Sequence, residues 1–178
     1  MGPATGGVSP PVAGPPSTTR GTMRLSIPGR RTYDLEHLVL DLNGTLGLDG
    51  KLLEGVAPRL ALLKSLLRPV ILTADTHGGA AQVRRELGVQ VAVLEAGRDE
   101  ALQKAEFVRD LGAERVVAVG NGANDVLMLK EAAIGICVLG PEGTATEAVA
   151  SADLVVLDIL TGLDLLLHPQ RLVATLRR

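Results

Sequence analysis

Several polar residues in the sequence are of types that could bind a phosphoryl group or a hard cation. Asp41 follows an apolar run and opens the stretch Asp41-Leu42-Asn43-Gly44-Thr45-Leu46. A carboxylate held at the end of a strand can act as a nucleophile. The backbone amide of Gly44 and the hydroxyl of Thr45 could donate hydrogen bonds to an anion. Taken alone, Asn43-Gly44 is also a strong turn signal, with Asp41 as the turn starter.

Two further segments carry similar chemistry. Thr73 ends a second apolar run, where its hydroxyl could hold a phosphoryl oxygen, although threonine is also common as a strand end or a cap. The stretch Gly120-Asn121-Gly122-Ala123-Asn124-Asp125 follows a third run and offers oxygen ligands to Mg²⁺. As plain structure, it would be a turn followed by a capped helix. The absence of histidine and cysteine clusters agrees with Mg²⁺ rather than a softer metal.

Lys104 occupies an unexpected place in the segment 99–111. At about 100° per residue, this lysine falls inside the apolar face of the segment, which is formed by Ala101, Ala105, Val108 and Leu111. A solvated lysine should lie on the opposite face. Lys104 therefore either extends along the protein surface to water or points inward to neutralise an anion.

The elements that position these residues alternate along the chain. Short apolar runs predict strands at 38–42, 69–73, 89–94, 116–119, 134–139 and 154–157. Segments with helical spacing predict helices at 56–67, 76–87, 99–111, 123–132, 143–150 and 159–167. Residues 24–34 are expected to form a hairpin or an extra edge strand around Pro28-Gly29.

This alternation predicts an α/β fold of three layers, with a mostly parallel sheet covered by helices on both faces. Ligands of such sheets bind beyond the carboxyl ends of the strands. Asp41, Thr73 and the segment 120–125 all follow predicted strands. We therefore expect them to meet at one edge of the sheet.

The length of 178 residues predicts one domain. Residues 1–22 contain five prolines, five glycines and one charge, so we expect a disordered Pro/Gly-rich tail followed by a single domain over 23–178.

Composition argues against several classes of function. No apolar run approaches the ~20 residues of a membrane helix, and the N-terminus has no secretory signal pattern. Because Tyr33 and Phe107 are the only aromatic residues and the net charge is −2, nucleic-acid binding is not expected. One cysteine excludes an internal disulfide, three scattered histidines argue against zinc, and the cytosol is the expected compartment.

The motifs resemble those of the haloacid dehalogenase (HAD) superfamily, above all the phosphorylation domain of P-type ATPases. Those ATPases carry D-K-T-G-T-L, T-G-D and G-D-G-x-N-D motifs; here the counterparts are D-L-N-G-T-L from Asp41, Thr73-Ala74-Asp75 and G-N-G-A-N-D from Gly120. The likeness covers about 38–165 and implies a Rossmann-like HAD fold. Each interval between motifs holds one strand–helix unit, so no cap domain is expected.

The resemblance also implies roles for individual residues. Asp41 would form an aspartyl-phosphate, with Gly44, Thr45, Thr73 and Lys104 binding the phosphoryl oxygens. Mg²⁺ would be held by Asp41, by the backbone carbonyl of Asn43, and by the residues at the positions of the family's acids, which are Asn121 and Asp125. The substrate would be a phosphorylated small molecule or macromolecule.

Two departures from the family pattern bear on the rate. HAD phosphatases usually have a second Asp where this chain has Asn43, and an amide cannot supply the general acid–base catalysis, which is worth about 10²–10⁴ in rate. Asn121 replaces a charged metal ligand with a neutral one. We therefore expect a Mg²⁺-dependent phosphohydrolase or phosphotransferase with slow turnover.

Two alternatives remain open. A catalytically impaired HAD domain could bind phosphate, metal or a partner protein as a regulator, which the two asparagines favour. A receiver-like phosphoacceptor domain would need an acidic pair before its central strand, and only Asp34 and Glu36 are available. Oligomeric state is also open, because apolar segments such as Leu163–Leu167 could pack internally or against another copy.

Overall fold

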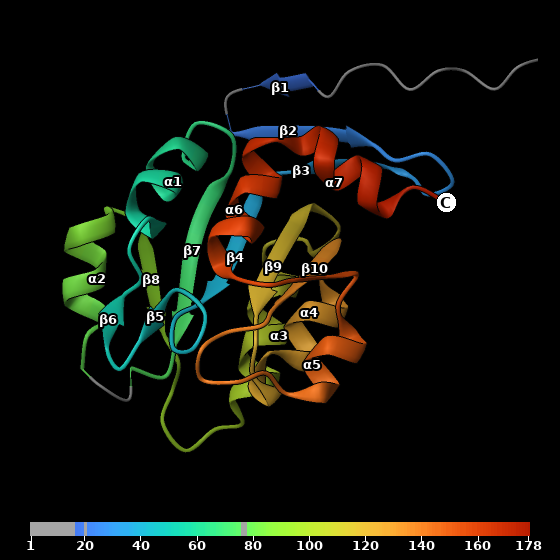
Figure 1. Cartoon of the computed structure of the whole chain (residues 1–178). Helices are drawn as coiled ribbons and strands as arrows, with labels where there is room; N and C mark the ends of the chain where they lie inside the picture. The colour runs from blue at the N-terminus through green and yellow to red at the C-terminus, as the bar shows by residue number, and fades with distance from the viewer. Residues whose placement is uncertain (1–16, 20, 76–77) are drawn as a thin grey trace, which may run out of the picture.

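A six-stranded parallel sheet forms the centre of the computed structural model, which describes residues 17–19, 21–75 and 78–178 (Figure 1). Its strands are β4 (His37–Asp41), β7 (Arg68–Thr73), β8 (Gln90–Val93), β9 (Val116–Gly120), β10 (Ile134–Val138) and β11 (Leu154–Val156). They lie in the order β11-β10-β9-β4-β7-β8, and every neighbouring pair is parallel. Since β4 lies between β7 and β9, the residues that follow these three strands emerge side by side.

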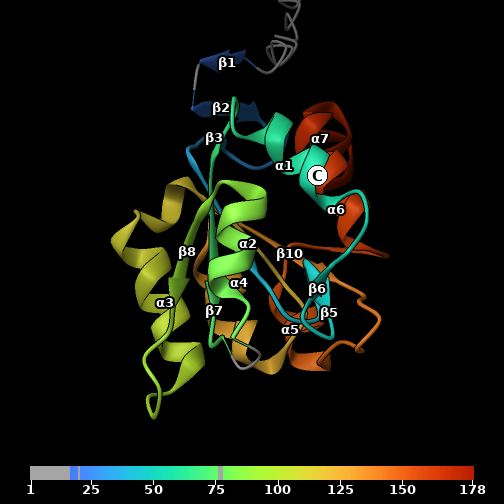
Figure 2. The same cartoon turned by 90° about the vertical axis from the view of Figure 1, so that its left-hand side faces the viewer.

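Helices cover both faces of the sheet, as the alternating pattern predicts. One face carries α1 (Val56–Leu63), α2 (Ala80–Leu87) and α6 (Ile159–Leu167). The other carries α3 (Glu100–Asp110), α4 (Val126–Glu131) and α5 (Thr146–Ser151). Figure 2 shows α3 on one side of the sheet and α1 and α6 on the other. The three-layer α/β fold is therefore confirmed.

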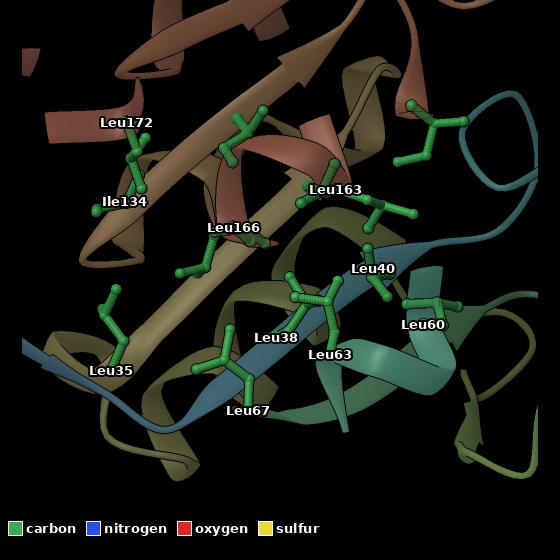
Figure 3. Packing of buried hydrophobic residues seen from close by; sticks show 14 of the residues in the cluster. Leu35, Leu38, Leu40, Leu60, Leu63, Leu67, Ile134, Leu163, Leu166 and Leu172 are labelled. Carbon is green, nitrogen blue, oxygen red and sulfur yellow. The ribbon is translucent and has the colours of Figure 1, made fainter. Parts of the chain in front are cut away.

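The strands supply apolar side chains to both faces because successive residues of a strand point in opposite directions. In β4, Leu38 and Leu40 belong to the core beneath α1 and α6, whereas Val39 belongs to the core beneath α3 and α4. Figure 3 shows Leu38 and Leu40 packed near Leu60 and Leu63 of α1. Each fully buried leucine stabilises the fold by roughly 1.5–3 kcal/mol relative to an exposed one, so the central strand is held firmly from both sides.

A second, antiparallel sheet precedes β4. The expected hairpin within 24–34 is present as β2 (Thr22–Ser26) and β3 (Thr32–Leu35). A further strand, β1 (Ser17–Thr19), pairs with β2. Residues 17–19 and Thr22 were expected to belong to a disordered tail, but they lie in strands. β-branched threonines favour the extended backbone of a strand. Positions 1–16 and 20 of the expected tail lie outside the described residues.

A C-terminal helix, α7 (Pro169–Leu176), was not expected from the sequence. Its Leu172 and Leu176 are buried in the same core as Met23 and Leu25 of β2. The backbone N–H of Arg178 donates to the carbonyl of Pro28 at 3.0 Å. The end of the described chain is thereby fixed to the β2–β3 hairpin.

Directly after the segment that follows β4, a small hairpin of β5 (Gly47–Leu48) and β6 (Lys51–Leu52) projects beside the sheet. Its two-residue turn is Asp49-Gly50, with φ of 50° and 75°, as a type I′ turn requires. The hairpin turn is therefore at Asp49-Gly50 and not at Asn43-Gly44. Within the described ranges, only this hairpin, α1, α2 and strands β7 and β8 stand between Asp41 and α3, so no cap domain is present there.

Four predicted helices differ from the observed ones by three residues or more at one end. The segment 56–67 gives a helix that ends at Leu63. The segment 76–87 gives a helix only from Ala80, with positions 76 and 77 outside the described residues. The segment 143–150 begins its helix at Thr146, and 123–132 divides into a 3₁₀ turn, Ala123–Asp125, and α4.

Leu163 and Leu166 lie inside the core rather than on an outer face. Among the described residues, every helix is too short or too polar to cross a membrane.

Candidate functional site

Asp41, at the carboxyl end of β4, lies in a cleft where the loops after β7, β9 and β10 converge. Asp41, Thr73 and Asn121 are all buried, with 6%, 1% and 7% of their surfaces exposed. The cleft is lined by Asp41, Asn43, Thr73, Ala74, Glu100, Lys104, Asn121, Gly122, Asn124 and Glu142. The sheet thus brings together the predicted motifs, which are scattered over more than 80 positions of the sequence.

Lys104 points inward from α3 to the end of β4, which is one of the two possibilities that its place on the apolar face left open. Its Nζ lies 2.7 Å from Asp41 Oδ1 and 2.7 Å from Asp125 Oδ1. Only 1% of Lys104 is exposed, and Asp125 is fully buried. A single ammonium therefore bridges two buried carboxylates.

The start of α3 fixes the direction from which Lys104 approaches. The Asp99 side chain caps the helix by accepting a hydrogen bond from the backbone N–H of Leu102 at 2.9 Å. The side-chain amide of Gln103 accepts from the N–H of Glu95 at 2.8 Å and donates to the Glu95 carbonyl at 3.1 Å. The loop between β8 and α3 is thus tied to the first turn of the helix.

Asp125 has a structural place in this centre. Its Oδ2 accepts hydrogen bonds from the backbone N–H groups of Asn121 and Gly122, each at 2.9 Å. A Cβ on Gly120 would lie 2.5 Å from this carboxyl group, so only glycine fits there. Since Lys104 engages the other oxygen, Asp125 is committed to shaping the loop after β9. The expected role of Asp125 as a metal ligand receives no support from these contacts.

The buried carboxylates perturb one another. Burial raises the pKa of Asp41 to about 7, the nearby charge of Asp125 adds to this, and Lys104 opposes it. Burial alone would lower the pKa of Lys104, but Asp41 and Asp125 outweigh it and raise the pKa to about 12. Lys104 thus stays charged at neutral pH. In the metal-free protein, the Asp41 carboxyl group keeps its proton to a higher pH than an ordinary aspartate does.

Asn121 joins two loops through its side chain. Its Oδ1 accepts a hydrogen bond from Thr45 Oγ1 at 3.0 Å, and its Nδ2 donates to the carbonyl of Gly143 at 2.9 Å. The first contact holds the segment after β4, and the second holds the loop after β10. A carboxylate could not make the second bond, because it has no hydrogen to donate.

Thr73 and Asp75 shape the neighbouring loop. Thr73 Oγ1 accepts from the backbone N–H of Asp75 at 3.0 Å, and Asp75 Oδ1 accepts from the N–H of Ala80 at 2.8 Å. Asp75 has a φ of 52°, which is uncommon for a residue other than glycine. Thr73 lines the cleft, as predicted, while Asp75 holds the start of α2.

The residues present can form a sparse site for Mg²⁺. The candidate donors are oxygens only: the Asp41 carboxylate, the Asn43 backbone carbonyl and the Asn121 amide, all around one cleft. Mg²⁺ in proteins often binds through one or two carboxylates, and substrate phosphates and water complete its shell. In the part of the chain that the structure describes, no group of three or more His, Cys, Asp or Glu forms a metal cage. The donor set fits Mg²⁺. It contains one carboxylate, so it carries one negative charge fewer than a site with two carboxylates.

Three cleft residues were not singled out from the sequence as separate site residues: Glu100, Asn124 and Glu142. Asn124 Nδ2 donates to Glu100 Oε2 at 2.7 Å, which joins the first turn of α3 to the loop after β9. Glu142 lies in the loop after β10. The sequence marks Glu142 only as part of the family likeness, which includes Glu142-Gly143, and not as a site residue. Its place in the cleft depends on the distant contact between Asn121 and Gly143.

Comparison with known proteins gives a consistent result. The profile of the haloacid dehalogenase-like hydrolase family matches residues 18–133. An uncharacterized protein of Methanocaldococcus jannaschii is 45% identical over 82 residues, which are 44% of this chain and 88% of that protein. A probable copper-transporting ATPase of Arabidopsis thaliana is 33% identical over 134 residues, or 70% of this chain. The match spans only 13% of that ATPase.

A solved structure shares the fold. It is the 3-deoxy-D-manno-octulosonate 8-phosphate phosphatase of Moraxella catarrhalis, in complex with magnesium ion, phosphate ion and KDO. The TM-score is 0.57 at 18% identity, and the match covers 80% of this chain and 94% of the phosphatase. At this identity the likeness concerns the arrangement of the helices and strands.

Proposed function

Because the chain belongs to the haloacid dehalogenase-like hydrolase family, we propose that it transfers phosphoryl groups through an aspartyl-phosphate on Asp41. The observation that carries the proposal is the buried contact of Lys104 with both Asp41 and Asp125. An inward lysine at this place is costly unless its charge is used. Here it would neutralise a carboxylate nucleophile and the phosphoryl oxygens that approach it.

The proposed step uses groups of the cleft, the substrate, Mg²⁺ and a water molecule that supplies one proton. A carboxylate oxygen of Asp41 attacks phosphorus, and the bond from phosphorus to the leaving oxygen breaks. The leaving oxygen keeps the electron pair and takes a proton from water, since Asn43 has no acidic proton to give. The Thr73 hydroxyl and the Lys104 ammonium would hold the phosphoryl oxygens during transfer. The expected contribution of the Gly44 N–H receives no support, because this group donates to the Gly47 carbonyl at 2.8 Å.

Mg²⁺ bound to Asp41 and the Asn43 carbonyl would supply positive charge next to the transferred group. Lys104 already provides one fixed positive charge, 2.7 Å from Asp41 Oδ1. We propose that both charges are needed to keep Asp41 ionised at neutral pH, because burial and Asp125 raise its pKa to about 7.

Slow release of phosphate is part of the proposal. With an amide at Asn43, no side chain at that position can activate water against the aspartyl-phosphate, which removes about 10²–10⁴ in rate. The phosphorylated form of Asp41 is therefore expected to persist. A phosphorylated small molecule or macromolecule is the proposed substrate class. The alternative is a catalytically impaired domain that binds phosphate, metal or a partner protein as a regulator.

Thermal unfolding with Mg²⁺ plus beryllium fluoride tests the site without a guess at the substrate. Beryllium fluoride mimics a phosphoryl group on a carboxylate, and saturation at about 100 times the Kd stabilises the fold by ~2.7 kcal/mol. For a chain of this size this raises Tm by several degrees. We expect the shift to require Mg²⁺ and to vanish in Asp41→Ala.

The matched control is Asp110→Ala, which removes an exposed carboxylate at the far end of α3. This variant should keep the full shift. A wild-type protein that gains no stability from Mg²⁺ plus beryllium fluoride would contradict the proposed aspartyl-phosphate chemistry. A shift without phosphate release from any phosphorylated compound would favour the regulator alternative.

A further inference from the structure

We propose that Glu142 supplies the second negative charge of the cation site, in place of the acid that Asn121 does not provide; this rests on the Mg²⁺ chemistry proposed above. Glu142 is remote from Asp41 in sequence and belongs to the loop after β10. It lines the same cleft as Asp41, Asn43 and Asn121. The proposal concerns where the missing charge of the site comes from.

The loop that carries Glu142 is attached to Asn121 by two hydrogen bonds. Asn121 Nδ2 donates to the carbonyl of Gly143 at 2.9 Å, and the backbone N–H of Ala145 donates to the carbonyl of Asn121 at 2.9 Å. Thr144 Oγ1 also donates to the carbonyl of Val138 at 2.9 Å, which closes the loop on its own strand. The residue next to Glu142 is therefore fixed by the amide that replaces the acid.

The loop also touches the segment after β4. A Cβ on Gly140 would lie 2.3 Å from the backbone oxygen of Gly44, so the two glycines are in close backbone contact. A Cβ on Gly44 would lie 2.6 Å from Asn121 Nδ2, 2.8 Å from Glu142 Oε2 and 3.1 Å from Asn121 Oδ1. The Glu142 carboxylate and the Asn121 amide thus converge on one point above Gly44, one residue from Asn43.

The Glu142 carboxylate is available for a cation. No hydrogen bond or ion pair engages it among residues 17–19, 21–75 and 78–178. The residue is exposed, and Mg²⁺ usually keeps several waters, so Glu142 can act directly or through one of those waters. By contrast, Glu100 accepts a hydrogen bond from Asn124, and Asp125 is engaged by Lys104 and two backbone N–H groups.

The arrangement explains why an amide suits position 121. The amide hydrogen of Asn121 holds the Gly143 carbonyl, and a carboxylate there would repel that oxygen. An amide at position 121 thus removes one negative charge from the site. The same amide holds the loop at Gly143, and this loop carries the carboxylate of Glu142. The net charge of the cation site is restored from a different segment.

Calorimetric titration of the whole chain with Mg²⁺, in metal-free buffer, tests this inference. Glu142→Gln keeps the size of the side chain and removes its charge. We expect Mg²⁺ to bind about tenfold more weakly, since a unit charge near a divalent cation at a solvated site is worth about that factor. Glu147→Gln, which removes an exposed charge from α5, should bind Mg²⁺ as the wild type does.

Two further measurements separate charge from structure. Urea unfolding in EDTA should give Glu142→Gln the same stability as the wild type, because its carboxylate has no partner among the described residues. The double variant Asn121→Asp/Glu142→Gln places the carboxylate in the loop after β9 instead of the loop after β10. Its affinity for Mg²⁺ should be close to that of the wild type, which reverses most of the tenfold loss.

The outcomes distinguish the two proposals. If the wild type binds Mg²⁺ and Asp41→Ala does not, while Glu142→Gln binds as tightly as the wild type, the role of Glu142 is overturned and the proposed function stands. A Glu142→Gln variant that loses stability in EDTA along with affinity would also overturn it, in favour of a structural role. If the wild type binds no Mg²⁺, both proposals fail.

Discussion

Lys104 Nζ lies 2.7 Å from Asp41 Oδ1, although 63 positions separate the two residues in the sequence. The contact joins the middle of α3 to the end of the central strand, and both side chains are buried. A buried ion pair stabilises the fold only while both partners are present, because a single buried charge is strongly unfavourable. The stability of the metal-free protein should therefore report directly on this contact.

Replacing the lysine should reveal two like charges in the interior. In Lys104→Met, Asp41 and Asp125 lose the ammonium that separates them. We expect the free energy of unfolding in EDTA to fall by about 3–5 kcal/mol, measured by urea denaturation. Lys130→Met, at an exposed lysine of α4, should change it by less than about 0.5 kcal/mol. Equal urea midpoints for Lys104→Met and the wild type would show that the ion pairs do not matter for folding.

The pH dependence of stability should depend on Asp41. Its pKa is raised by burial from 3.8 to about 7, so between these values the folded protein holds a proton that the unfolded chain releases. The free energy of unfolding of the metal-free protein should therefore fall as pH rises through this range. The slope from this one group cannot exceed about 1.4 kcal/mol per pH unit.

Asp41→Asn has no proton to lose at this position. The stability of Asp41→Asn relative to the wild type should rise as pH rises from about 4 to about 7 and then level off. Urea titrations of both proteins in EDTA across this range provide the measurement. Curves that stay parallel would mean that Asp41 has an ordinary pKa in the fold.

Returning an acid to position 43 should speed phosphate release. In Asn43→Asp, a carboxyl group next to the nucleophile could protonate the leaving oxygen and then activate water. We expect hydrolysis of p-nitrophenyl phosphate with Mg²⁺ to rise about 10²–10⁴-fold. Asn43→Thr has a side chain of similar size without acidity and should give no such gain. The same rate for the Asp and Thr variants would show that position 43 does not limit turnover.

Gly44 should tolerate no side chain. Its φ is 77°, and an added Cβ would meet the side chains of Asn121 and Glu142 within 3.1 Å. Gly97 has a similar φ of 80° with no atom within 4 Å of an added Cβ, so Gly97→Ala measures the backbone strain alone. Thermal unfolding should show that Gly44→Ala costs about 1–3 kcal/mol more than Gly97→Ala. Equal losses would show that the loop after β10 moves away freely.

Much of this fold could be predicted from short-range patterns. Apolar runs predicted the six strands. The four inner strands β4, β7, β9 and β10 are buried on both faces, whereas the edge strands β8 and β11 are apolar but partly exposed. The helical period placed Lys104 on the core side of α3. The helix α7 was missed although the segment carries helix signals, with Pro169 at its first position and Leu172 and Leu176 at helical spacing. The two-residue strands β5 and β6 are too short to show alternation, although Asp49-Gly50 carries the turn signal.

The candidate site was predictable to a lesser degree. The order of strands in the sheet brings Asp41, Thr73 and Asn121 together, and each residue follows a recognisable strand. The division of labour within the site depends on contacts between distant loops. Two features follow from the folded geometry alone. Lys104 and two backbone N–H groups hold Asp125. The carboxylate of Glu142 lies over Gly44.

The hydrogen bonds of two glycine nitrogens also bear on the chemical ageing of the protein. Asparagine followed by glycine deamidates when the glycine nitrogen attacks the asparagine side-chain carbonyl and closes a five-membered ring. The Gly44 N–H donates to the carbonyl of Gly47 at 2.8 Å, and the Gly122 N–H donates to Asp125 Oδ2 at 2.9 Å. Both attacking nitrogens thus have their hydrogens engaged, and ring closure would have to break these bonds. Asn43 and Asn121 should remain amides in stored protein. The cleft of an aged sample should therefore carry the same charge as that of a fresh one.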